Sequence, residues 1–243
     1  MIARARKLLS VPGKYSSYFR DWRGFESLVR SAGDNRFPLE WSDRMPAVWE
    51  NSATTRFDAH YVYHTAWAVR MVTRAAPAKH VDISSTVYFC TTLSATVPVD
   101  FFDFRPAPIT LDGLYCGRED LTQLSFADDS IPSLSCMHTI EHVGLGRYGD
   151  PLDPAGDLKA CEELKRVVAP GGQLIIVLPV GKPKICFNAH RIYSFAQILD
   201  MFSGFSIVDT ALVRDNAEFV QNPLEAEFDA QAYGCGCFLF RKE

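Results

Sequence analysis

The segment between residues 120 and 172 constrains the fold more than any other part of the chain. It contains a polar turn, an apolar run at 133–140, a charged rim and a Pro-Gly-Gly turn, and a second apolar run follows at 173–180. Apolar runs that alternate with helical stretches are typical of a parallel α/β sheet. Ligands of such sheets bind at the carboxyl ends of the strands. Three polar residues fall at these ends: Asp120, Glu141 and His142.

The same alternation continues on both sides of this segment. Seven strands are predicted, at 80–83, 97–102, 109–116, 133–140, 173–180, 205–213 and 234–241. Residues 86–96 have room for a crossover helix between the first two strands. The last strand alternates in a way that suits an edge or hairpin position. The fold class predicted from these patterns is α/β.

Two amphipathic helices are predicted within the α/β part. Asp153 is a favourable N-cap and Pro154 a favourable first residue for one helix. The apolar stripe of that helix consists of Leu158, Cys161, Leu164 and Val168. The other helix covers 195–202 and ends before Gly204.

The first part of the chain has a different pattern. Helical spacing of apolar residues precedes Gly33, and a second helix is predicted at 57–75, before Pro77. We therefore expect a helical extension at 1–77, which flanks the sheet or covers its ligand end, and an α/β domain at 78–243.

Composition argues against several classes of function. The net charge is −4 and the pI is near 5.9, so nucleic acid is not expected to be the main partner. No apolar run reaches the roughly 18 residues that a membrane helix needs, and the apolar run near the amino terminus is too short for a signal peptide. We therefore expect a cytoplasmic protein with no integral membrane segment.

The cysteines point to the same compartment. There are seven, several of them inside apolar runs, as is usual for reduced thiols in cytoplasmic proteins. Cys235-Gly-Cys237 could in principle chelate a metal ion, but no Cys/His pair at ligand spacing accompanies it. Alternate residues of a strand explain the motif better, and no metal ion is expected.

The order of these elements resembles the second half of class I S-adenosylmethionine (SAM)-dependent methyltransferases. The resemblance implies a Rossmann-like, seven-stranded, mostly parallel sheet whose sixth and seventh strands form a carboxyl-terminal antiparallel hairpin, with SAM as the cofactor. The segments at 205–213 and 234–241 would supply that hairpin. A dinucleotide-binding sheet would instead require a further parallel unit.

A set of residues at successive strand ends fits the demands of SAM. Asp103 follows the second strand and is placed to accept hydrogen bonds from both ribose hydroxyls. Asp120 matches the family's position for the adenine amino group, with Leu121 beside it. His138 falls at the end of the fourth strand and should line the methyl-transfer centre.

The loop after the first strand departs from the family pattern. Class I methyltransferases have an acidic residue followed by alternating glycines, because the backbone approaches the ligand closely there. In this chain Asp82 is followed by Ser84, Thr86 and Tyr88 at the glycine positions. We expect Asp82, Ser84 and Ser85 to contact the cofactor, with the serines at its amino-acid tail.

The chain also resembles, over most of its length, the methyltransferase-like DUF268 family, whose genes are often found near those for surface-glycan biosynthesis. The resemblance is carried by 82–85, by His138-Thr-Ile-Glu-His-Val-Gly-Leu-Gly-Arg-Tyr-Gly-Asp150 and by Phe187-Asn-Ala-His-Arg-Ile-Tyr193. It implies that an altered glycine loop is ordinary in such proteins.

Two histidines are candidates for a general base. His142 follows Glu141, and His190 precedes Arg191, each after an apolar strand, so their side chains are expected to meet at one rim. A hydroxyl acceptor loses its proton as the methyl group arrives, and a neutral histidine can take it. Either histidine could instead hydrogen-bond backbone at the start of a helix.

A glycine-rich loop at 144–151 is predicted to face the substrate. Arg147 and Tyr148 on this loop, together with Asn188 and Arg191, are the candidate substrate-binding residues. The two arginines would suit an anionic acceptor, or each could pair with a nearby carboxylate.

The sequence therefore indicates a SAM-dependent methyltransferase that methylates an oxygen of a sugar or surface-glycan intermediate. The partner would be a small-molecule or glycan acceptor, and a homo-oligomer is compatible with the sequence. One alternative is a catalytically silent methyltransferase-fold binding protein, because the glycines are missing. Another, an NAD-dependent enzyme acting on a nucleotide sugar, is disfavoured because no Gly-x-Gly-x-x-Gly follows the first strand.

Overall fold

The computed structural model describes residues 11–34 and 36–243, so the start of the predicted extension lies outside the described residues. The chain divides into two compact units, one ending at Phe57 and the other spanning Asp58–Glu243. Every helix of the described residues is too short or too polar to span a lipid bilayer.

The first unit contains α2 (Val11–Ala32) and a 3-10 turn, η1 (Trp41–Asp43). The predicted helix before Gly33 is confirmed, and Gly33 takes a φ of +59° just beyond its end. Aromatic contacts hold η1 against the helix, with the rings of Trp22 and Trp41 centred 5.1 Å apart.

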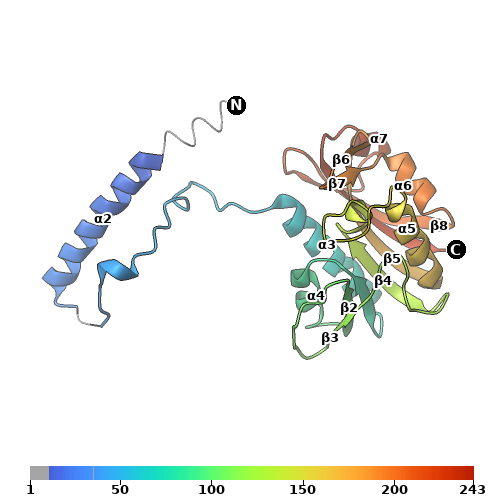
Figure 1. Ribbon diagram of the computed structural model, residues 1–243, viewed down its shortest axis with the longest axis horizontal. Helices are drawn as coiled ribbons and strands as arrows, with labels where there is room; N and C mark the ends of the chain where they lie inside the picture. Colours follow the sequence, from blue (N-terminus) through green and yellow to red (C-terminus); the bar gives the residue numbers. More distant parts are fainter. Residues whose placement is uncertain (1–10, 35) are drawn as a thin grey trace. The chain divides into compact units, whose positions relative to one another are not determined.

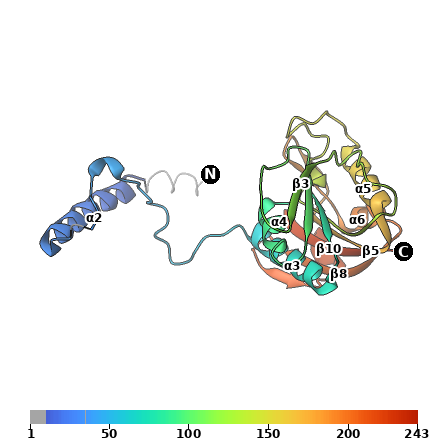
Figure 2. The same cartoon turned by 90° about the horizontal axis from the view of Figure 1, so that it is seen from below.

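The second unit is built on a sheet of eight strands in the order β3-β2-β1-β4-β5-β10-β8-β9 (Figures 1 and 2). The strands are β1 (His80–Ile83), β2 (Val99–Asp103), β3 (Leu114–Arg118), β4 (Ile131–Met137), β5 (Val168–Val180), β8 (Phe205–Val213), β9 (Phe219–Gln221) and β10 (Gly234–Lys242). Strands β1 to β5 pair in parallel, and β10 pairs antiparallel with β5 and β8. The predicted mostly parallel sheet with a terminal antiparallel hairpin is confirmed.

Helices cover both faces of this sheet. Helices α3 (Ala59–Ala75) and α4 (Val87–Leu93) pack on one face, and α5 (Gly156–Val167) and α6 (Phe195–Met201) pack on the other. Strand β10 separates the two cores, with Cys235, Cys237 and Leu239 facing α3 and α4. Phe238 and Phe240 of the same strand face α5 and α6.

Helix α3 belongs to the α/β unit, which starts before the predicted boundary at residue 78. Its N-cap is Asp58, whose side chain accepts a hydrogen bond from the backbone N–H of Tyr61. Trp67, Met71 and Val72 on its inner face are almost fully buried in the core. The Trp67 indole also donates a hydrogen bond of 3.2 Å to Asp209 of β8.

Several predicted bounds differ from the structure. Strand β3 starts at Leu114 rather than 109, because Asp112-Gly113 forms a turn that an isolated bridge between Leu111 and Leu114 closes. Helix α5 starts at Gly156, and its N-cap is Ala155 rather than Asp153. Leu158 is 51% exposed and lies outside the buried stripe of that helix.

The carboxyl-terminal region holds elements that the sequence did not predict. Of the two predicted positions, edge or hairpin, β10 takes the hairpin one and is buried between β5 and β8, while the unpredicted strand β9 occupies the edge. A short hairpin of β6 (Lys184–Cys186) and β7 (His190–Ile192) precedes α6, and α7 (Glu225–Asp229) precedes β10. A second 3-10 turn, η2 (Ile140–His142), follows β4.

Candidate active site

The carboxyl ends of the first four strands open into a cavity of about 640 Å³. It is lined by seven of the residues that the sequence singled out: Ser84, Asp103, Asp120, Leu121, His138, His142 and Tyr148. The other seven are not among the lining residues: Asp82, Ser85, Glu141, Arg147, Asn188, His190 and Arg191. The parallel topology brings the first set together, because the strand ends share one edge of the sheet.

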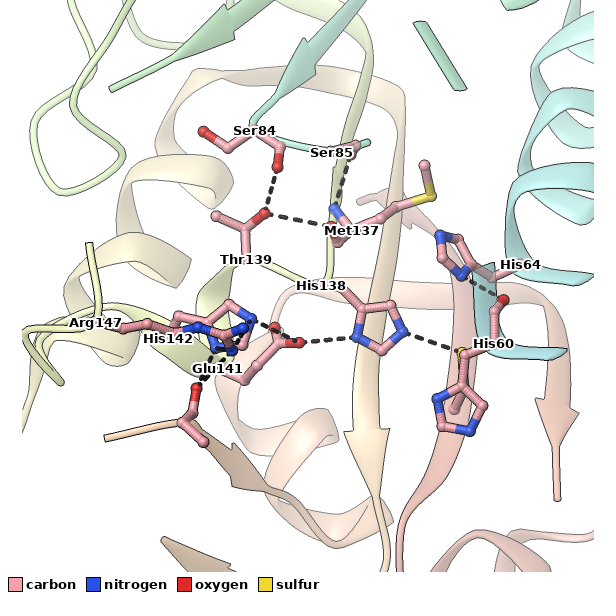
Figure 3. A network of polar contacts seen from close by, with 12 residues as sticks. His60, His64, Ser84, Ser85, Met137, His138, Thr139, Glu141, His142 and Arg147 are labelled. Atoms are coloured by element: carbon pink, nitrogen blue, oxygen red, sulfur yellow. Dashed lines mark hydrogen bonds and ion pairs between the residues drawn. The ribbon is translucent and has the colours of Figure 1, made fainter. Parts of the chain in front are cut away.

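Ser84 takes the backbone conformation that a glycine would take in the first loop. Its φ is +59°, in the left-handed region that L-residues seldom occupy. The Ser84 N–H donates to the carbonyl of Phe102 at 2.7 Å, and its own carbonyl accepts from the Thr139 hydroxyl at 2.8 Å. The turn after β1 is thus formed without glycine and is tied to β2 and to the segment that follows β4 (Figure 3).

Asp82 and Ser85 support this loop from within the protein. The Asp82 carboxylate is fully buried and accepts hydrogen bonds from the Ser135 hydroxyl and from the Ser85 N–H. Burial raises the pKa of Asp82 to about 6, although these hydrogen bonds oppose the shift. The Ser85 hydroxyl accepts from the N–H of Met137 at 3.0 Å. Both residues therefore hold β1 against β4 rather than face the cavity, which differs from their predicted contact with cofactor.

The two predicted cofactor aspartates stand at the mouth of the cavity. Asp103, half-buried at the end of β2, accepts a 2.7 Å hydrogen bond from the backbone N–H of Arg105 through Oδ1. Asp120 is exposed and accepts from the N–H and hydroxyl of Thr122 through its own Oδ1. In both side chains the structure gives Oδ2 no hydrogen-bond partner among the described residues, so one oxygen of each carboxylate can accept from a ligand.

His142 presents a polarised imidazole to the cavity. Its Nδ1 lies 2.6 Å from the carbonyl oxygen of Ala189, which can only accept, so Nδ1 carries the proton and Nε2 has the lone pair, with Arg147 Nη1 3.4 Å from Nε2. Burial lowers the pKa of His142, and the nearby Glu141 carboxylate opposes that shift. Arg147 also donates to the Ala189 carbonyl, at 3.0 Å. The imidazole is therefore held neutral and fixed in orientation.

His138 lies deeper and is bound to Glu141. The two side chains are 5% and 1% exposed, and His138 Nδ1 lies 2.8 Å from Glu141 Oε1 (Figure 3). Burial lowers the pKa of His138 to about 4 and raises the pKa of Glu141 to about 7. Glu141 Oε1 is also 3.7 Å from His142 Nε2, while Oε2 has no hydrogen-bond partner among the described residues. The Glu141 carboxylate therefore contacts His138 and also lies close to His142.

The sequence predicted that the side chains of His142 and His190 meet at one rim. In the structure His142 instead contacts the backbone next to His190. His142 bonds the carbonyl of Ala189, next to His190, but the His190 ring packs on Tyr233 with centroids 4.7 Å apart. Asn188 is exposed. Neither His190 nor Asn188 lines the cavity at the strand ends.

Arg191 has a structural position rather than the predicted substrate contact. Its side chain is 6% exposed, and its Nε lies 3.5 Å from the buried carboxylate of Asp157. The guanidinium also donates to the backbone carbonyl of Val143 at 2.7 Å. It therefore fastens the loop after η2 to α5 and β7. The sequence also allowed Arg191 to pair with a nearby carboxylate, and the structure shows this ion pair.

The predicted substrate loop wraps around a carboxylate. Asp150 accepts hydrogen bonds from the backbone N–H groups of Gly144, Gly146 and Tyr148. Gly144 has a φ of +79°, and a Cβ there would lie 2.0 Å from the carbonyl oxygen of Asp153, so only glycine fits. The loop presents Tyr148 at the cavity, where the Arg105 guanidinium lies 4.8 Å from the ring centroid.

Other lining residues were not predicted from the sequence to belong to the site. They include Glu119, Arg105, Thr139, Lys159 and Asp153. Glu119 directly follows β3, so a correct bound for that strand would have pointed to it. The sequence offered no signal for His60 of α3, whose ring stacks on His138 at 6.0 Å.

A protein-family model matches part of this chain. The model of a family described as "Caenorhabditis protein of unknown function, DUF268" matches residues 125–229, a shorter stretch than the resemblance noted in the sequence. It covers two of the three motifs that carry that resemblance and omits the loop at 82–85. No curated protein has a significantly matching sequence.

Solved structures with the same fold include methyltransferases. The N-methyltransferase NodS from Bradyrhizobium japonicum WM9, in complex with S-adenosyl-L-homocysteine, is 13% identical, with a TM-score of 0.53 over 89% of this chain and 97% of that chain. The YcgJ protein from Bacillus subtilis is 11% identical, with a TM-score of 0.50 over 73% of this chain and 99% of that chain.

A third structure shows that the fold does not determine the reaction. The [4+2]-cyclase SpnF is 15% identical, with a TM-score of 0.54 over 80% of this chain and 86% of that chain. These similarities are similarities of fold, and the activity has to be argued from the site itself.

Proposed function

We propose that this chain, which has the fold of class I methyltransferases, is a SAM-dependent methyltransferase that acts on a hydroxyl group. The observation that carries the proposal is the cavity of about 640 Å³ at the carboxyl ends of β1 to β4, whose wall includes the carboxylates of Asp103 and Asp120 and the imidazole of His142. A volume of roughly 300–1,000 Å³ is usual for small-molecule sites.

The residues present fit the cofactor. Asp103 offers its free oxygen to the ribose diol, and Asp120 offers a carboxylate oxygen to the adenine amino group. Ser84 supplies the left-handed turn at the cofactor's amino-acid tail. SAM supplies the electrophilic methyl group when it is bound.

The acceptor hydroxyl is deprotonated by His142. Its Nδ1–H is engaged by the Ala189 carbonyl, so Nε2 accepts the acceptor's proton as the oxygen takes the methyl group. Glu141 Oε1, 3.7 Å from Nε2, stabilises the imidazolium that results. His190, which does not line the cavity, is proposed to support the rim through its packing on Tyr233.

The acceptor is proposed to be a sugar or surface-glycan intermediate. An exposed aromatic ring, Tyr148, stands at the cavity beside the guanidinium of Arg105, and Lys159 lines the same cavity. The carboxylates of this wall, together with Arg105 and Lys159, can exchange hydrogen bonds with the hydroxyl groups of a polar acceptor such as a sugar. Arg147, exposed and next to His142, would orient the acceptor.

Calorimetric titration with SAM and with S-adenosylhomocysteine tests the cofactor assignment. We expect one molecule of either ligand to bind per chain. Asp103→Ala should weaken binding about ten- to a hundredfold, because a charge-assisted hydrogen bond contributes about 1.5–3 kcal/mol. Asp112→Ala, an exposed aspartate that does not line the cavity, is the matched control and should bind like the parent.

Failure to bind either ligand at saturating concentration would favour a catalytically silent methyltransferase-fold protein. Binding by the parent with no loss in Asp103→Ala would refute the ribose assignment alone. Transfer of labelled methyl from SAM to a panel of sugar phosphates and nucleotide sugars then tests the acceptor class.

A further inference from the structure

Three side chains of metal-binding types from distant parts of the chain meet at His138, which also lines the cavity. One nitrogen each from His60 and His138 and the sulfur of Cys235 lie within 4.8 Å of one another. His60 comes from the start of α3, His138 from the end of β4 and Cys235 from β10. Figure 3 shows His138 between Glu141 and His60.

The orientation of His138 is the one that a metal ligand requires. Its Nδ1 faces the Glu141 carboxylate at 2.8 Å, so Nδ1 carries the proton and Nε2 carries the lone pair. Nε2 faces Cys235 Sγ at 3.4 Å. A carboxylate that holds the far nitrogen of an imidazole is the usual second partner of a metal-bound histidine.

The distance between His138 Nε2 and Cys235 Sγ suits a tetrahedral ion, and the His60 nitrogen lies within 4.8 Å of both atoms. Bonds of about 2.0–2.1 Å to nitrogen and about 2.3 Å to sulfur place the two ligand atoms about 3.5 Å apart in a tetrahedral zinc site. The observed separation of Nε2 and Sγ is 3.4 Å. The third ligand, His60, is half-buried at the start of its helix and can be reached by an ion from solvent.

One buried oxygen beside these side chains has no hydrogen-bond partner among the described residues. Glu141 is 1% exposed, and its Oε2 accepts no hydrogen bond from them. A divalent cation bonded to His138 would supply positive charge one imidazole ring away from the carboxylate.

We propose that His60, His138 and Cys235 form a zinc site, with Glu141 as the carboxylate that orients His138. Two imidazoles and one thiolate are the donors that zinc favours, and three protein ligands leave the fourth position for water or a ligand atom. Zinc binding displaces the proton of the Cys235 thiol to solvent, so the affinity rises with pH. The proposal does not depend on methyl transfer.

Titration of the chelator-treated full-length protein with Zn²⁺ and Co²⁺ tests the site. We expect one ion per chain, and the Co²⁺ form should show the visible bands of tetrahedral coordination and a sulfur-to-metal charge-transfer band. The melting temperature should rise with Zn²⁺ concentration, since the ion binds the folded chain. No binding above the level of a denatured sample, or Co²⁺ bands without sulfur character, would overturn the proposal.

Variants locate the site. His60→Ala is the primary variant, because this half-buried residue can be changed with little effect on the core, and it should weaken Zn²⁺ binding at least tenfold. Cys235→Ala should abolish the sulfur-to-cobalt band. Glu141→Gln should weaken binding about ten- to a hundredfold, the usual effect of losing a carboxylate behind a ligand histidine.

Cys161→Ala is the matched control. Cys161 is as buried as Cys235 but lies in α5, in the core on the opposite face of the sheet, and its loss should leave Zn²⁺ affinity unchanged. Equal affinity in His60→Ala and the parent would contradict the ligand assignment, whatever the stability of the other variants.

Discussion

Ser84 adopts a φ that ordinarily requires glycine, and this determines how the first loop tolerates substitution. An L-residue in the left-handed region costs about 1–2 kcal/mol, whereas glycine loses about 0.5–1 kcal/mol of extra entropy on folding. Ser84→Gly should therefore keep or slightly raise the free energy of unfolding, and Ser84→Val should lower it by about 1 kcal/mol or more. Urea denaturation measures both. Equal stabilities of the two variants would show that the loop relaxes.

His142 is expected to set the pH dependence of turnover. Burial lowers its pKa below the ordinary value of about 6.5, and only the neutral form accepts a proton. The value of kcat/KM should therefore be constant above that ordinary value and fall as the pH drops through the lowered pKa. His142→Ala should lower kcat about a hundredfold and leave SAM affinity unchanged.

His190→Ala is the matched control for this prediction, because His190 lies at the same rim without lining the cavity. It should keep kcat within a few-fold of the parent. A reversed result, with kcat lost in His190→Ala and kept in His142→Ala, would assign the base to His190.

A position at or after a strand end was only a partial guide to the cavity, because Ser85 and Glu141 follow strands but do not line it. Asp103 and His138 reach the cavity because parallel strands end at one edge. Asp82 lies one residue inside its strand. Its carboxylate accepts a hydrogen bond from Ser135 of β4, a strand far away in sequence. A side-chain contact between strands that are distant in sequence leaves no pattern in the local sequence.

At the scale of elements, Arg191 of β7 connects its strand to α5 and to the loop after η2, and its replacement should lower the free energy of unfolding. Its guanidinium pairs with Asp157 of α5 and donates to the carbonyl of Val143. Removing one partner of a buried pair leaves the other charge uncompensated, at a cost of roughly 3–5 kcal/mol. Arg191→Ala should lower the free energy of unfolding by about that amount, as measured by chemical denaturation.

Arg147→Ala provides the comparison, since Arg147 is exposed. It should change stability by no more than about 0.5 kcal/mol. A similar stability for Arg191→Ala would return Arg191 to the candidate substrate contacts.

Elements were predictable where hydrophobic periodicity was strong, as for β8, whose observed bounds match the prediction at 205–213. Strand β3 was misplaced because Asp112-Gly113, a turn signal, was included within it. For β10 the alternation of residues allowed an edge or a hairpin position. The structure pairs it antiparallel with β8, and Gly236 has no room for a Cβ beside Val180 and Phe238. Close packing of this kind appears only in the tertiary structure.

At the scale of the whole molecule, the placement of α3 predicts where the chain can be shortened. The second compact unit starts at Asp58, so a chain of residues 58–243 keeps the complete core and should fold cooperatively. A chain starting at residue 78 would lack Trp67, Met71 and Val72, which are 2%, 4% and 1% exposed in the core beside β8 and β10. Each such side chain contributes about 1.5–3 kcal/mol through burial.

The summed loss is comparable to the roughly 5–15 kcal/mol that stabilises a typical domain. The longer chain should therefore melt in one sharp transition, and the shorter one should aggregate or melt without cooperativity. Calorimetry and near-ultraviolet circular dichroism distinguish the two states. Because the longer chain also retains His60, it should bind Zn²⁺ as the full chain does, whereas a folded chain starting at residue 78 would show that α3 is not part of the core.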